Sequence, residues 1–231
     1  MTLERTGIYG GTFNPIHLGH LRAARSVADQ LGLARVVFIP SGRPPHKHAD
    51  DPDDPIADPN LRLSWVREAI ADEPRFEASS LEVERDGPSY LVDTLAALRS
   101  ERAGERLVFL LGRDAFEDLG NWREPRRLLT LADFAVTTRP PETEGDLRDW
   151  LPESVRGDIE CAADGKVAFH REAGTRIELV DIRALDVSAT AVRAHVRAGR
   201  PLEGLVPERI REKIERSGVY TDRGSATEPV K

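Results

Sequence analysis

His17 and His20, near the start of the chain, are the residues best suited by type and spacing to bind a negatively charged ligand. They lie three positions apart, so on a helical turn both side chains occupy one face, roughly 5–6 Å from each other. Two imidazoles placed in this way can donate charge-assisted hydrogen bonds to a polyphosphate. We expect Gly19, which lies between them, to keep that face open for the ligand.

The two histidines end a glycine-rich turn, residues 10–20, that follows a short apolar run. Gly10 and Gly11 let backbone N–H groups come close to a ligand, and Thr12 adds a hydroxyl. The helix expected to begin there has N–H groups without helical partners and the positive end of its dipole, and both favour an anion. The string matches neither the GxGxxG pattern of dinucleotide-binding folds nor the GxxxxGKS/T pattern of P-loops.

The histidine pair could instead serve one of two different roles. It could be half of a zinc site, although no cysteine or third histidine lies at a suitable spacing nearby. The two side chains could also have a purely structural role at the start of a helix.

A second candidate phosphate site lies near the end of the chain, at residues 187–193. Ser188 and Thr190 can cap the helix expected to begin there, and Arg193 lies one turn further on the same side as Thr190. A capped helix start with an arginine beside it can bind phosphate. Taken alone, however, this pattern is more often an ordinary N-cap.

Strand and helix patterns alternate along the rest of the chain, and these elements must position the two candidate sites. Apolar runs predict strands over residues 7–10, 36–39, 107–111, 134–137 and 177–182. Helical patterns are found over residues 20–31, 61–71, 89–99, 125–131, 190–198 and 207–216, with a further helix around 147–155 in an acidic, irregular stretch. The alternation predicts an α/β fold with three layers, a mostly parallel sheet and ligands at the carboxyl ends of the strands.

No stretch of the chain resembles an interdomain linker. We therefore expect a single domain over residues 1–220, with a helical C-terminal part over residues 186–220. Residues 41–60 are rich in proline and aspartate and are expected to form a long substrate loop. Residues 221–231 are expected to form a flexible tail.

The composition excludes several functional classes. The chain has 231 residues, 39% of them hydrophobic, and no apolar run long enough to span a membrane. The first residues lack the apolar segment of a secretory signal, and Cys161 is the only cysteine. A single cysteine excludes an internal disulfide framework and favours the cytoplasm. The net charge of −7 opposes a nucleic-acid partner, although arginines greatly outnumber lysines.

The string at residues 17–20, HLGH, resembles the HxGH motif of the nucleotidyltransferase superfamily, whose fold is Rossmann-like. In that superfamily the two histidines bind the triphosphate and stabilise charge in the transition state. Residues 187–193 resemble the ISSTxxR motif of the adenylyltransferases: Ser188, Thr190 and Arg193 match, while alanine replaces the second serine. The resemblance implies that these groups hold the β- and γ-phosphates of ATP.

Further stretches resemble one family within that superfamily, the bacterial nicotinate-mononucleotide adenylyltransferases. They are PPHK at residues 44–47, ERDGPSYLVDTL at 84–95, FLLGRD at 109–114 and LGNW at 119–122. The ATP-binding residues that the resemblance implies are Gly10, Gly11, Thr12, Phe13, His20, Gly112, Asp114, Ser188, Thr190 and Arg193. Those implied to bind nicotinate mononucleotide are His46, Lys47, Tyr90, Leu91, Trp122 and Arg139. His17, His20, Lys47 and Arg193 are implied to act in catalysis.

This resemblance implies that the adenylyl group of ATP is transferred to nicotinate mononucleotide, which gives deamido-NAD and pyrophosphate in NAD biosynthesis. Mg²⁺ is expected on the ATP phosphates rather than in a metal site built by the protein. Family members are often homo-oligomers, so a homo-oligomer is left open.

Leu91 departs from the family pattern, which usually has threonine near the nicotinate carboxylate. Leucine offers no hydroxyl, so an enzyme for nicotinamide mononucleotide, or one of dual specificity, is an alternative. In other classes, a nucleotide-sensing module without catalysis and an arginine-rich nucleic-acid-binding protein are the competing hypotheses.

Overall fold

The computed structural model describes residues 3–45, 55–138, 145–182 and 185–221. These residues form one eight-stranded sheet with the strand order β3-β2-β1-β4-β5-β8-β7-β6. The strands are β1 (Glu4–Gly11), β2 (Arg35–Pro40), β3 (Phe76–Ala78), β4 (Glu105–Gly112), β5 (Asp133–Thr138), β6 (Ile159–Cys161), β7 (Val167–His170) and β8 (Arg176–Asp181). All neighbouring pairs from β3 to β8 are parallel, and only β7 runs antiparallel to its neighbours β8 and β6.

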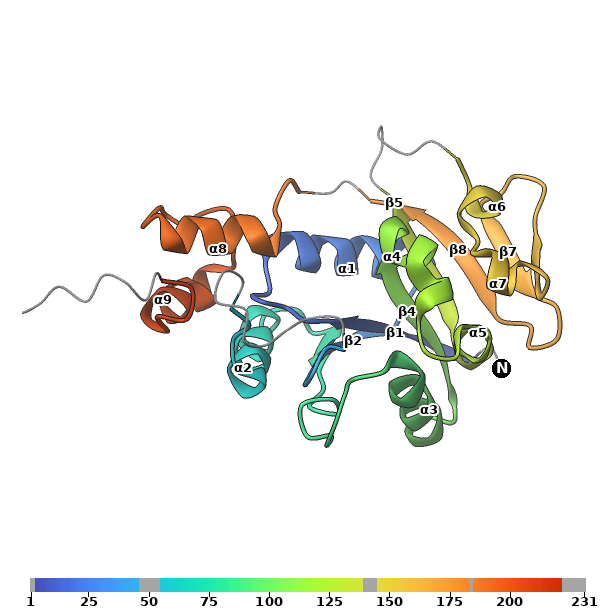
Figure 1. Ribbon diagram of the computed structural model, residues 1–231, viewed down its shortest axis with the longest axis horizontal. Helices are drawn as coiled ribbons and strands as arrows, with labels where there is room; N and C mark the ends of the chain where they lie inside the picture. Colours follow the sequence, from blue (N-terminus) through green and yellow to red (C-terminus); the bar gives the residue numbers. More distant parts are fainter. Residues whose placement is uncertain (1–2, 46–54, 139–144, 183–184, 222–231) are drawn as a thin grey trace, which may run out of the picture.

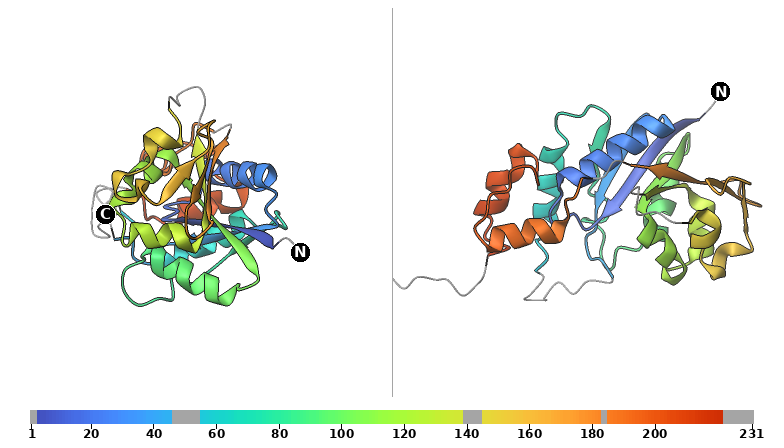
Figure 2. Two further views of the ribbon diagram at one scale, coloured as in Figure 1. Left: turned by 90° about the vertical axis from the view of Figure 1, so that its right-hand side faces the viewer. Right: turned by 90° about the horizontal axis from the view of Figure 1, so that it is seen from above.

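Helices cover both faces of this sheet. They are α1 (Leu18–Leu31), α2 (Pro59–Ala69), α3 (Leu91–Glu101), α4 (Arg113–Glu117), α5 (Pro125–Leu131), α6 (Leu147–Trp150), α7 (Glu153–Arg156), α8 (Ala189–Arg197) and α9 (Glu208–Arg216), with a 3₁₀ turn at Asp118–Asn121. Figure 1 shows α1 and α3 on opposite sides of β1, and α8 and α9 at the end toward which β1 runs. Figure 2 shows the same arrangement from two other directions, with the β6–β8 part at the opposite end. No helix in these ranges is long and apolar enough to cross a membrane.

The alternation of side chains in β2 explains the three layers. Val36 and Phe38 pack into the core cluster that holds the buried face of α1, while Val37 and Ile39 pack into the cluster that holds the buried face of α3. Successive strand residues point to opposite faces, so a strand buried on both sides is apolar throughout. The predicted α/β fold with a mostly parallel sheet and C-terminal helices is thus confirmed.

Several short elements differ from the sequence-based expectation. Strands β3, β6 and β7 and helix α4 are too short to give a clear periodic pattern, and they were not expected. The single helix expected around residues 147–155 is wrong: the structure has two short helices, α6 and α7, with Pro152 as the N-cap of α7. Proline lacks the backbone N–H that a continuous helix would need at this position.

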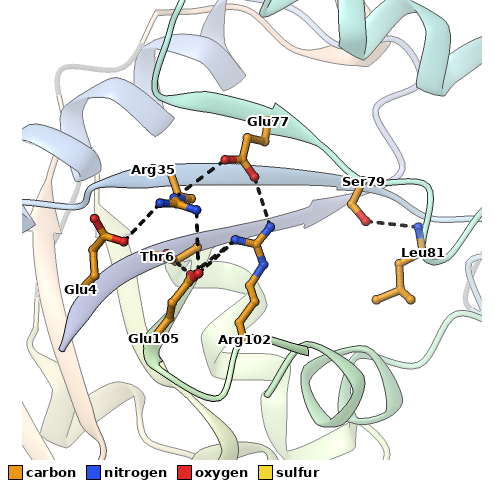
Figure 3. A network of polar contacts seen from close by, with 8 residues as sticks. All are labelled: Glu4, Thr6, Arg35, Glu77, Ser79, Leu81, Arg102 and Glu105. Atoms are coloured by element: carbon orange, nitrogen blue, oxygen red, sulfur yellow. Dashed lines mark hydrogen bonds and ion pairs between the residues drawn. The ribbon is translucent and has the colours of Figure 1, made fainter. Parts of the chain in front are cut away.

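A network of polar and charged side chains joins the strands at the end of the sheet opposite to the carboxyl ends. It comprises Glu4, Thr6, Arg35, Glu77, Arg102 and Glu105 (Figure 3). Arg102 Nη2 lies 3.1 Å from Glu77 Oε2, and the Thr6 hydroxyl donates a 2.5 Å hydrogen bond to Glu105 Oε2. Burial acts to raise the pKa of Glu105, but Thr6, Arg102 and Arg35 outweigh burial and hold that pKa below its usual value. The network therefore fixes the start of β4 against its neighbours.

Candidate active site

The glycine-rich turn leaves the sheet where β1 ends, next to the carboxyl end of β2. Gly11 pairs with Pro40 in the sheet, and the Ser41 amide then donates a 2.9 Å hydrogen bond to the Gly11 carbonyl. Phe13 has a φ of 47°, in the left-handed region that costs a non-glycine residue about 1 kcal/mol. A parallel sheet binds ligands at this edge, so the turn lies where the α/β fold predicts a site.

Asn14 holds the turn in place through its buried side chain. Its Nδ2 donates to the Pro55 carbonyl at 3.0 Å, and its Oδ1 accepts from the Ala57 amide at 3.0 Å. The same oxygen accepts a 2.6 Å hydrogen bond from the Tyr220 hydroxyl, which is also buried. The turn is thus fixed both to the segment before α2 and to the C-terminal part of the chain.

His17 and His20 stack on each other at the start of α1. Their ring centroids lie 3.6 Å apart with an angle of 27° between the planes. His17 is the N-cap of α1, and its backbone amide donates a 3.2 Å hydrogen bond to Nδ1 of His20. Because Nδ1 of His20 is an acceptor, the neutral imidazole carries its proton on Nε2, which is the nitrogen that can donate to a ligand.

Gly19 lies where a side chain would not fit. A β-carbon at this position would lie 3.0 Å from the His17 ring and 3.2 Å from the Val187 carbonyl oxygen. Both distances are tighter than ordinary van der Waals contact, so glycine makes room for the His17 ring and for the segment before α8. Gly19 thus lies between the first histidine and the segment before α8, and its effect on ligand access stays a prediction.

The second motif meets the first through Arg193. The Ser188 hydroxyl caps α8 by accepting a 3.1 Å hydrogen bond from the Ala191 amide, as expected for an N-cap. Arg193 is buried, and its Nη1 donates to the Asn14 carbonyl at 2.9 Å. Its Nη2 lies 3.3 Å from the Thr190 hydroxyl oxygen. The structure therefore places the start of α8 directly beside the glycine-rich turn.

A pocket of about 410 Å³ opens next to this turn. Gly10, Gly11, Thr12, Tyr90, Leu91 and Trp122, all expected from the sequence to bind substrate, line it. The other lining residues are Ser41, Pro45, Glu82, Ser89, Phe109, Asn121, Arg123 and Leu128. The Trp122 ring packs edge-on against Phe109, with centroids 6.4 Å apart, and its Nε1 donates to Asp118 Oδ2 at 3.2 Å. The pocket has one aromatic wall and is of a size that suits a small-molecule substrate.

The other expected residues do not line this pocket. Those of the two motifs, Phe13, His17, His20, Ser188, Thr190 and Arg193, lie in the glycine-rich turn and at the starts of α1 and α8. Gly112 is the exposed N-cap of α4 at the carboxyl end of β4, and Asp114 is exposed in the first turn of that helix. Neither residue lines the pocket. His46, Lys47 and Arg139 lie outside the described residues.

Glu82 is a pocket residue that no sequence motif indicated. It is buried, and its Oε1 accepts a 2.7 Å hydrogen bond from the Thr94 hydroxyl. Burial raises the pKa of this carboxyl group, although hydrogen bonds from Thr94 and Ser89 act in the opposite direction. A single glutamate in a turn gives no periodic or spacing signal, so only the structure could identify it.

Arg62 is the second residue that sequence reasoning missed. It is fully buried in α2, where its Nε donates to the Ala57 carbonyl at 2.8 Å. Its Nη1 donates to the Thr12 carbonyl at 2.6 Å, and its Nη2 donates to the Ser41 carbonyl at 2.7 Å. Desolvation lowers the pKa of Arg62, and nearby acidic groups offset part of this effect. One guanidinium thus ties the glycine-rich turn to two residues near the two ends of the stretch 41–60, Ser41 and Ala57.

Comparisons with known proteins show the family to which the chain belongs. Residues 8–195 match the family model described as cytidylyltransferase-like. The chain is 40% identical over 217 residues to a probable nicotinate-nucleotide adenylyltransferase of Geobacter metallireducens, covering 94% of this chain and 98% of that protein. It is 39% identical over 219 residues to a protein of the same description from Trichlorobacter lovleyi, covering 94% of this chain and 99% of that protein.

Solved structures show the same fold. The nicotinic acid mononucleotide adenylyltransferase of Plasmodium falciparum, solved in complex with NaAD, superposes with a TM-score of 0.70. The sequence identity is 14%, and the match covers 94% of this chain and 97% of that chain. At this identity the likeness supports the fold alone, whereas the relatives near 40% identity support the closer relationship. The chain therefore belongs to the cytidylyltransferase-like family and, within it, to the nicotinate-nucleotide adenylyltransferases.

Proposed function

We propose that the protein transfers the adenylyl group of ATP to nicotinate mononucleotide at the pocket beside the glycine-rich turn, and so forms nicotinate adenine dinucleotide and pyrophosphate. The observation that carries this proposal is the meeting of the two motifs, in which Arg193 donates to the Asn14 carbonyl at 2.9 Å. A histidine pair and a capped helix start then flank one site at the carboxyl edge of the sheet. The relatives of about 40% identity carry the same activity in their descriptions.

The reaction needs no nucleophile from the protein. A 5′-phosphate oxygen of the mononucleotide attacks the α-phosphorus of ATP and forms the new P–O bond in line. The bond from the α-phosphorus to the bridging oxygen breaks on the opposite side, and pyrophosphate leaves with that electron pair. Catalysis of such a transfer consists mainly of positioning the two substrates and stabilising the spreading negative charge.

Nε2 of His20 is the donor that we assign to the triphosphate. The His17 amide occupies Nδ1 of His20, so the opposite nitrogen carries the proton and the ring orientation is fixed. His17 supports the ring by stacking, with centroids 3.6 Å apart. Thr190 and Arg193, with Ser188 at the cap of α8, are assigned to the β- and γ-phosphates, and Lys47 to the transferring phosphate.

We assign Mg²⁺ to the phosphates of ATP. Among the described residues, no group of three or more histidine, cysteine, aspartate or glutamate side chains could hold a metal ion. The oxygens of the ATP phosphates and of water suit Mg²⁺, which keeps several waters and binds substrate phosphates more readily than an all-protein cage. When bound, Mg²⁺ neutralises charge on the phosphates.

The aromatic end of the pocket is assigned to the pyridine ring of the mononucleotide. Trp122 and Tyr90 line this end, and Leu91 is the first residue of α3. The first N–H groups of a helix lack partners within the helix, so the start of α3 can bind a carboxylate even though leucine has no hydroxyl. Leu91 also favours a second candidate function, namely an enzyme that accepts nicotinamide mononucleotide as well. His46 and Arg139 are assigned to the mononucleotide from the family resemblance.

A product assay tests the proposal. Purified protein is mixed with Mg-ATP and, in separate reactions, with nicotinate mononucleotide, nicotinamide mononucleotide or phosphopantetheine, and the products are identified by mass. We expect nicotinate adenine dinucleotide to form far faster than the other two products. A preference for nicotinamide mononucleotide would support the proposed adenylyl transfer but refute the proposed substrate. If no adenylyl group is transferred to any of the three acceptors, the proposed function is wrong.

Residues 1–220 are assigned to one nucleotidyltransferase domain, and the reaction is assigned to the cytoplasm. We assign this location because the reaction uses ATP and because the sequence has a single cysteine. The molar mass in solution, measured by light scattering, tests whether the protein forms a homo-oligomer.

A further inference from the structure

Arg123 stands out among the described residues that line the pocket, because it is the one cation there. Glu82 is the one carboxylate, and burial raises its pKa. The same pocket is lined by the aromatic or apolar residues Tyr90, Leu91 and Trp122 and by the neutral Asn121. A positive charge at this end of the pocket can therefore distinguish a mononucleotide whose pyridine ring carries an anionic substituent from one whose ring substituent is neutral.

The Arg123 guanidinium lies over the ring of Tyr90. The guanidinium carbon is 4.6 Å from the ring centroid, which is the distance of a cation–π contact. A cation–π contact uses no hydrogen-bond acceptor, so the N–H groups of the guanidinium can still bind a carboxylate bidentately. Tyr90 therefore holds the cation at the pocket wall without occupying its donors.

Two carboxylates lie near Arg123, but neither forms a hydrogen bond with it. Asp93 Oδ2 is 3.9 Å from Nη1, and Glu124 Oε1 is 3.8 Å from Nε. Both separations exceed the hydrogen-bond range, and both carboxylates are exposed, so screening weakens these pairs. Arg106 lies 2.6 Å from Asp133 in the same protein, so the carboxylates near Arg123 neutralise its charge less than Asp133 neutralises that of Arg106.

We infer that Arg123 is a specificity-determining residue that favours a mononucleotide bearing a carboxylate on its pyridine ring over one bearing a carboxamide. This inference rests on the proposed function and deepens it. Leu91 supplies no hydroxyl for the ring substituent, and Arg123 lies in the same part of the pocket. A cation contributes to the binding of the carboxylate but little to that of the neutral carboxamide.

The test compares Arg123→Gln with the parent enzyme on both mononucleotides. We expect kcat/KM for nicotinate mononucleotide to fall about tenfold, which is typical of losing a charge-assisted contact at a partly exposed site. The value for nicotinamide mononucleotide is expected to change less than about twofold. Arg123→Lys should restore part of the loss, and Asp93→Asn should shift the preference toward nicotinate by removing the competing carboxylate.

Arg126→Gln is the matched control, because Arg126 is an exposed arginine on α5 that contacts Asp158 and the Ser154 carbonyl and does not line the pocket. We expect this variant to keep the substrate preference of the parent. An equal loss on both mononucleotides in Arg123→Gln would mean that Arg123 acts on the shared phosphate or only supports Tyr90, and would overturn the inference. An unchanged preference would overturn it as well.

Calorimetric titration of each mononucleotide separates this inference from the proposed function. The ratio of the two dissociation constants reports the preference without turnover. If the parent enzyme binds nicotinate mononucleotide but forms no dinucleotide, the proposed function fails, and the ratio measured in Arg123→Gln still decides the role of Arg123.

Discussion

Replacing Arg62 by methionine should destabilise the protein strongly, because this one side chain satisfies carbonyl groups in separate parts of the site. Its guanidinium donates to the carbonyls of Ala57, Thr12 and Ser41 at 2.8, 2.6 and 2.7 Å, and the side chain is fully buried. Methionine has a similar length but no donor, so these acceptors would lose their partner. A buried acceptor left without a partner costs about 1–3 kcal/mol.

The net loss is expected to be about 3 kcal/mol, because removing a buried charge recovers part of its desolvation cost. Burial lowers the pKa of Arg62, which indicates that the folded protein disfavours the charged form to some extent. In a protein of this size, such a loss corresponds to a fall in Tm of roughly 10 °C. Arg62→Lys keeps the charge but not the planar fork of donors, so an intermediate loss is expected.

Urea unfolding followed by circular dichroism measures these losses. Arg67→Met is the matched control, since Arg67 is exposed on the same helix, and it should change the free energy of unfolding by less than about 0.5 kcal/mol. A loss below about 1 kcal/mol in Arg62→Met would refute the reasoning, because the three carbonyls would then be satisfied without the arginine.

Three further predictions follow from the same site. His20→Ala should lower kcat by about 10²–10³-fold in steady-state kinetics, the usual cost of one transition-state donor, and a near-parental rate would contradict its role at the triphosphate. Trp122→Ala should raise the KM for the mononucleotide more than the KM for ATP, and equal increases would argue against its place beside the pyridine ring. Glu82→Gln should be more stable than the parent by a margin that grows as pH rises. The free energy of unfolding of the parent falls as pH rises through the raised pKa of Glu82, whereas glutamine does not titrate. Urea midpoints of both proteins between pH 4 and 8 test this, and a difference independent of pH would disprove it.

The main elements of the fold could be predicted from the sequence because their signals are local. Helix α1 buries Leu21, Ala24, Val27 and Ala28 at helical spacing and ends at Gly32, whose φ of 60° suits glycine. Helix α5 begins at a proline and has the expected bounds. By contrast, β6 and β7 form an antiparallel extension of the sheet from three- and four-residue strands, which are too short for a periodic pattern.

The two candidate phosphate-binding motifs could also be found from the sequence, since each combines glycine, hydroxyl or imidazole groups with a helix start. Their contact could not be found in this way, because the hydrogen bond from Arg193 to Asn14 joins residues 179 positions apart. Arg62 and Arg123 gave no signal among the many arginines of the chain. Their importance follows only from the carbonyls and the aromatic ring that the folded chain places around them.

Isotope transfer from ATP tests the central claim most directly. Protein is mixed with Mg-ATP labelled at the α-phosphate and with nicotinate mononucleotide, and label is followed in the dinucleotide, in pyrophosphate and in the protein. We predict that all transferred label appears in nicotinate adenine dinucleotide, with one pyrophosphate released for each dinucleotide and no labelled protein. Label retained covalently on the protein, or pyrophosphate released without dinucleotide, would contradict direct transfer at this site.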